Sequence, residues 1–93
     1  MMERQAMKAV VARRTITLLC EELLRYAGWL DRKYALTVQA DIHALATAIE
    51  TKADAMPVLA VLESSLSRVP SGEVRRMMRV TSREIRKALD EPR

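Results

Sequence analysis

The chain has 93 residues, of which 49% are hydrophobic and 30% are charged, and its formal net charge is +4 at pH 7. This length holds one small domain, residues 1–93, whose core is modest enough that a partner or a second copy is a reasonable expectation. The single cysteine excludes an intrachain disulfide. Charged residues interrupt every apolar stretch that could be a signal peptide or a membrane span, so we expect a cytoplasmic protein.

The first predicted helix runs from about residue 3 to residue 27 and ends at Gly28, a residue typical of helix C-termini. Its main apolar face comprises Ala9, Ala12, Ile16, Leu19, Cys20, Leu23, Leu24, Ala27 and Leu30. A second apolar stripe across the helix contains Val11, Leu18 and Trp29. A helix that is apolar on two sides is either central in a bundle or part of an interface, and the sequence leaves both interpretations open.

Apolar periodicity predicts two further helices, one reaching about residue 53 and one ending near residue 68. Asp31 or Thr37 is a candidate N-cap of the former, and Pro57 suits the first turn of the latter. The predicted inner face of the former comprises Val38, Ile42, Leu45, Ala46, Ile49, Ala53 and Met56. Because the connecting segments are short, consecutive helices should pack antiparallel.

The last predicted helix, residues 73–89, follows a turn in which Ser71 is the expected N-cap. At the α-helical step its cations fall within one arc of roughly 120°, and its apolar residues fill a similar arc on the opposite side. The cations are Arg75, Arg76, Arg79, Arg83, Arg86 and Lys87. The acidic residues Glu73 and Glu84 lie at the margin of this cationic arc, which we expect to face outward.

Four interpretations of the cationic arc stay open: a solvated face, a phosphate-binding surface, a dock for an acidic protein, and a membrane-surface helix. A solvated face usually mixes charges of both signs. A row of cations instead matches the backbone contacts that dominate affinity for nucleic acid. A membrane-surface helix would need an aromatic anchor, which this helix lacks.

A capping-box pattern from Thr81 to Glu84 offers a different arrangement of the same residues. If it were used, the helix would split there into a helix–turn–helix. The cationic and apolar arcs both keep their phase through Thr81, however. We therefore expect a continuous helix.

All aromatic residues lie between residues 25 and 34, interleaved with cations that include Arg32 and Lys33. Rings beside cations are typical of single-stranded nucleic-acid binding and of protein interfaces. The simpler alternative is that the rings cover the corner between two helices and close the core. We expect this for Tyr26, whereas Trp29 lies on the second stripe and is left open between core and surface.

The sequence gives little support for catalysis or metal binding. His43 is the only histidine, and Asp41, two residues away, points elsewhere on the helix. Cys20 is expected to be a buried structural thiol. One cysteine and one histidine are too few ligands for a zinc site. We therefore expect no enzymatic activity, no cofactor and no metal.

The sequence thus predicts an all-α protein, a compact bundle of about four helices, with a helical hairpin completed by dimerisation as the alternative. Its predicted function is binding of nucleic acid, directly or as a small subunit of a nucleoprotein complex. The cationic arc would make the contacts, with Arg32 and Lys33 as a second patch. The alternative function is that of a protein-binding regulator, adaptor or inhibitor, or of a homodimer or other oligomer. Its interface would be the stripe of Val11, Leu18 and Trp29, or it would dock its cationic arc on an acidic protein. No membrane partner is expected.

Overall fold

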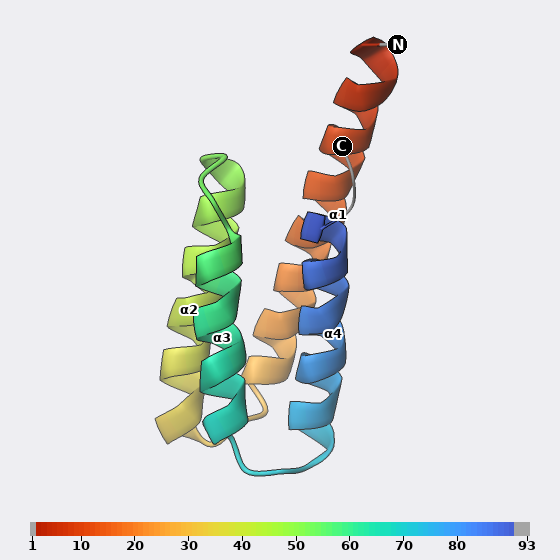
Figure 1. Ribbon diagram of the computed structural model, residues 1–93. Coiled ribbons are helices and arrows are strands. Elements are labelled where there is room, and N and C mark those ends of the chain that lie inside the picture. Colours follow the sequence, from red (N-terminus) through yellow and green to blue (C-terminus); the bar gives the residue numbers. More distant parts are fainter. Residues whose placement is uncertain (1, 91–93) are drawn as a thin grey trace.

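The computed structural model describes the backbone of residues 2–90 and the side chains of residues 13–90. It contains helices α1 (Met2–Ala27), α2 (Arg32–Glu50), α3 (Met56–Arg68) and α4 (Glu73–Asp90). The helices form an antiparallel bundle (Figure 1), in which each packs against the next along the chain and α4 closes the ring against α1. The predicted all-α, four-helix arrangement is confirmed.

Apolar side chains from all four helices fill the centre of the bundle. The largest fully buried ones are Leu23, Ile42, Leu45, Leu59, Leu62, Leu66, Met78 and Ile85. Burying one such side chain stabilises the fold by about 1.5–3 kcal/mol. Tyr26 packs half-buried against this core, as expected for a ring at the helix corner.

The two ends of the bundle differ. The loops 28–31 and 69–72 lie together at one end, which we call the double-loop end (Figure 1). The loop 51–55, the N-terminal end of α1 and the C-terminal end of α4 lie toward the opposite end of the bundle. With 26 residues, α1 is longer than α4 with 18, and its first turns extend beyond the other three helices. The whole measures 47 × 22 × 18 Å.

The start of each later helix agrees only in part with the sequence-based expectation. Asp31 is the N-cap of α2 by position, but its side chain makes no capping hydrogen bond. Pro57 lies in the first turn of α3, as predicted. At α4 the residue directly before the helix is Gly72, whose carbonyl accepts a hydrogen bond from the N–H of Arg76 at 3.1 Å. Ser71, the expected cap, therefore lies one residue too early.

Helix α2 ends at Glu50, about three residues before the predicted end. Lys52 adopts a left-handed conformation with φ of 59°, which turns the chain out of the helix. The N–H of Ala53 then donates to the carbonyl of Ala48 at 2.9 Å, the bond that defines a Schellman motif. Ala53, expected in the core, is consequently exposed.

Helix α4 is continuous through Thr81 and Ser82, so the split that the capping box would have produced is not present. Both hydroxyls bond to their own helix. Thr81 Oγ1 donates to the carbonyl of Met77 at 3.0 Å, and Ser82 Oγ donates to that of Arg79 at 2.9 Å. These bonds satisfy the hydroxyls without a cap, which allows both residues to be buried.

Candidate functional site

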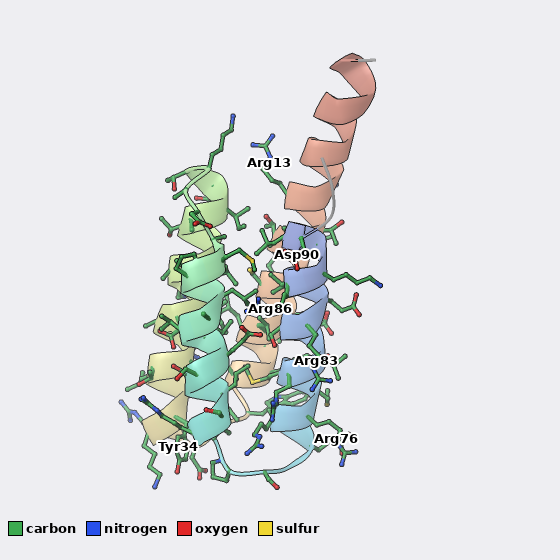
Figure 2. All side chains as sticks on the ribbon, viewed as in Figure 1. Arg13, Tyr34, Arg76, Arg83, Arg86 and Asp90 are labelled. Atoms are coloured by element: carbon green, nitrogen blue, oxygen red, sulfur yellow. The ribbon has the colours of Figure 1, made fainter. Side chains whose placement is uncertain are left out.

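The buried residues of α4 determine which of its cations reach the surface. Met78, Thr81, Ser82 and Ile85 face the bundle. The cations on the far side are exposed, and we call them the cationic ladder: Arg76, Arg79, Arg83 and Lys87. They follow one another at intervals of three or four residues, so they occupy an arc of about 80° and a length of about 16 Å. Figure 2 labels Arg76 and Arg83 along this helix.

Two of the six predicted cations belong to the flank of α4 instead. Arg86 Nε lies 3.2 Å from Glu63 Oε2, and a second guanidinium nitrogen contacts the other carboxylate oxygen. The hydrogen bond and the charge of Glu63 raise the pKa of Arg86 further. Arg75 donates to the carbonyl of Val69 at 2.8 Å. The expectation that all six cations face outward is therefore wrong for Arg75 and Arg86.

The ladder is bordered by carboxylates but not paired with them. Glu73 and Glu84 are exposed on the margin opposite Arg75 and Arg86. Asp90, the last residue of α4, falls within the cationic arc at its C-terminal end, beyond the predicted helix end. Among the side chains of residues 13–90, no carboxylate oxygen lies within 4.0 Å of a ladder nitrogen. Within the described side chains, the four charges are thus unpaired.

A second cationic region lies at the double-loop end. Arg32 and Lys33 are exposed there, and the Lys33 ammonium lies 5.0 Å from the centre of the Tyr34 ring. Trp29 is 67% exposed, and its ring centroid is 5.9 Å from that of Tyr26 at a tilt of 54°. Trp29 therefore belongs to the surface and not to the core.

Tyr26, whose ring lies next to that of Trp29, is held in place by a hydrogen bond within α1. Its hydroxyl donates to Glu22 Oε1 at 2.5 Å, one helical turn away. This hydrogen bond, together with burial and the charge of Glu22, raises the pKa of Tyr26. The ring is thus held between the core and the surface.

The second stripe of α1 faces solvent where the structure describes it. Leu18 is 57% exposed. Trp29, predicted on the same stripe, is also exposed but lies in the loop after α1. Val11 lies outside the described side chains. Because α1 contacts only α2 and α4 among the described helices, it is not a central helix of the bundle.

The remaining reactive side chains are dispersed. Cys20 is buried, and burial, with a smaller effect of Glu21, raises its pKa to about 11. His43 is exposed, whereas Asp41 accepts a hydrogen bond from Ser65 of α3. Within the described part of the chain, no three His, Cys, Asp or Glu side chains are grouped as metal ligands would be.

An open groove of about 280 Å³ lies between α1 and the end of α2. Its lining comprises Arg13, Arg14, Thr17, Ile49 and Glu50. Figure 2 shows Arg13 near the top of this region. No helix within residues 2–90 combines the length and apolarity that crossing a membrane requires.

Comparison of the chain with protein-family models, with curated proteins and with solved structures gives no match.

Proposed function

We propose that the protein binds nucleic acid through phosphate contacts of the cationic ladder, directly or within a nucleoprotein complex. The observation that carries the proposal is the set of four exposed cations on one helix face, with no described carboxylate within 4.0 Å. Contacts between such cations and phosphates supply most of the sequence-independent affinity for nucleic acid. The proposed role is that of a cytoplasmic binding protein without catalytic activity.

The spacing of the ladder supports a polyanionic partner over a merely solvated face. Arg79 and Arg83 are separated by one helical turn, as are Arg83 and Lys87. Each like-charge pair at this spacing destabilises a helix by about 0.2–0.5 kcal/mol. A bound row of phosphates would remove that repulsion. A helix that only faces solvent does not need a row of like charges, because charges of both signs give the same solubility.

The proposal is tested by fluorescence polarisation with a labelled oligonucleotide at low salt. We expect Arg79→Glu/Arg83→Glu to weaken binding at least about tenfold, because two phosphate contacts become repulsive. The matched control is Arg14→Glu/Lys52→Glu, which changes the net charge equally at exposed positions on α1 and in the loop 51–55, outside the ladder. Equal losses in the two variants, or no binding by the wild type, would contradict the proposal.

Self-association is a second candidate function, favoured by the exposure of two large apolar side chains, Leu18 on α1 and Trp29 in the loop that follows it. Leu18 is 57% exposed and Trp29 67%. A C2 dimer would bury the same stripe on both copies. Light scattering should then give a mass of two chains for the wild type and of one for Leu18→Glu. A single-chain mass for the wild type rules this candidate out.

A further inference from the structure

We infer that the nucleic acid is single-stranded, that it runs along the cationic ladder and over the double-loop end, and that an unpaired base stacks on Trp29. This inference rests on the proposed function, since the ladder supplies the phosphate contacts. It adds the chemical class of the ligand and a base-stacking residue.

Exposed cations are found on α4 and at the double-loop end. Arg76 lies in the first turn of α4, which starts at that end, and Arg32 and Lys33 start α2 at the same end, diagonally across the bundle from α4. The exposed charged residues at this end are Arg25, Arg32, Lys33, Arg68 and Arg76 against Asp31 and Glu73. Cations therefore predominate where the side of the bundle meets its end, and a bound strand has to turn there.

That turn distinguishes a single strand from a duplex. Double-stranded DNA has a persistence length of about 50 nm, roughly 500 Å. The longest dimension of the protein is 47 Å. A duplex therefore stays straight over this distance and contacts either the ladder or the end of the bundle. A single strand is flexible enough to contact both.

Trp29 has the properties of a stacking platform. The residue is 67% exposed, and its ring lies next to the Tyr26 ring, with 5.9 Å between the centroids. Its backbone N–H donates to the Tyr26 carbonyl at 2.9 Å, which fixes the turn that carries it. Stacking of bases on aromatic side chains is characteristic of single-strand binding and needs an unpaired base.

Because Trp29 is the only tryptophan, its fluorescence reports directly on stacking. We would titrate the full chain with an oligothymidine of about 12 nucleotides and with a blunt duplex of equal length. We expect the single strand to quench the fluorescence and the duplex to bind without quenching it. Trp29→Ala should weaken single-strand binding about 5- to 100-fold and leave duplex binding within about twofold.

Leu36→Ala is the matched control, because Leu36 is a similarly exposed apolar residue, at 61%, on α2. It should bind both ligands as the wild type does. If Trp29→Ala keeps full affinity for the single strand while Arg79→Glu/Arg83→Glu loses it, the stacking inference is wrong and the proposed function stands.

Two other outcomes would contradict the proposed function or the class of ligand. If the wild type binds neither nucleic acid at low salt, the proposed function fails, and the inference fails with it. If poly-glutamate of matched charge binds as tightly as the oligothymidine and quenches Trp29 equally, the ladder docks on an acidic polypeptide. That result overturns the assignment of a single-stranded ligand.

Discussion

Lys52 has the only positive φ among the described non-glycine residues, at 59°. In this conformation Cβ crowds the following carbonyl oxygen, which costs roughly 1 kcal/mol for an ordinary residue. Glycine adopts it without that crowding. Lys52 nevertheless has to adopt the left-handed conformation, because the Schellman motif that ends α2 requires it at this position.

We therefore expect Lys52→Gly to raise the free energy of unfolding by about 0.5–1 kcal/mol, since the relief of crowding exceeds the added entropy of the unfolded chain. Urea unfolding followed by circular dichroism measures the change. Lys52→Ala is the control and should leave stability within about 0.5 kcal/mol of the wild type. A Lys52→Gly variant no more stable than Lys52→Ala would show that the residue is not strained.

The same residue explains why the end of α2 was predicted too late. The usual sequence signal for a helix end of this type is glycine, which Lys52 does not provide. Apolar periodicity continued to Ala53 and Met56 and so extended the prediction. The C-terminus of α1 was predicted correctly because Gly28 directly follows its last residue.

Cys20 gives a probe of the core. Burial raises its pKa to about 11, so at pH 8 only about one thiol in a thousand is ionised. We expect a thiol reagent to label it only as fast as the bundle opens, and immediately once the chain is unfolded in urea. Labelling of the native protein at the rate of a free thiol would place Cys20 at the surface.

At the scale of the helix, α4 shows both the strength and the limit of a helical-wheel argument. The helical wheel correctly predicted the buried face, which includes Met78 and Ile85, and the exposed ladder. It could do so because the residues of each face recur with the helical period of α4. It could not assign the flanks. Arg86 is engaged by Glu63, and Arg75 by the Val69 carbonyl, and both partners come from outside the helix. Periodicity within one helix contains no information about its neighbours.

The continuity of α4 can be tested without a mutation. In a continuous helix the amides of Ser82, Arg83 and Glu84 are hydrogen-bonded within the helix, whereas in a split one they would belong to an unbonded first turn. We expect hydrogen exchange to show these amides protected to the same degree as that of Arg79. Exchange at the rate of an unstructured chain, confined to these three amides, would instead show a break.

The ion pair between Glu63 of α3 and Arg86 of α4 determines how many cations of α4 are free to contact a ligand. Glu63→Gln should release Arg86, and binding of a single-stranded oligonucleotide should strengthen several-fold. Stability should change by less than about 1 kcal/mol, because the pair is about one-third exposed and screened by solvent. Titration and urea unfolding measure the two effects.

Glu50→Gln is the control for Glu63→Gln, because it removes an equal charge at an exposed position beyond the ladder. An equal gain in affinity in both variants would mean that net charge alone, and not the release of Arg86, is responsible.

At the scale of the whole molecule, the number of helices followed from the sequence, because Gly28, Pro57 and the Val69–Gly72 turn separate four periodic segments. The packing of α4 against α1 could not be predicted from the sequence, because the apolar face of a helix does not reveal which other helix packs on it. The same packing places the loops 28–31 and 69–72 at one end of the bundle. Trp29 and Arg76 come from distant parts of the chain and lie at that end.

The most direct test of the ladder as a phosphate-binding surface is the salt dependence of affinity for single-stranded oligonucleotide. Four phosphate contacts predict a slope of log K against log salt of about −3, and the loss of two ladder cations in Arg79→Glu/Arg83→Glu predicts a slope of about −1.5 or shallower. A slope near zero for the wild type, or an unchanged slope for the variant, would contradict the account.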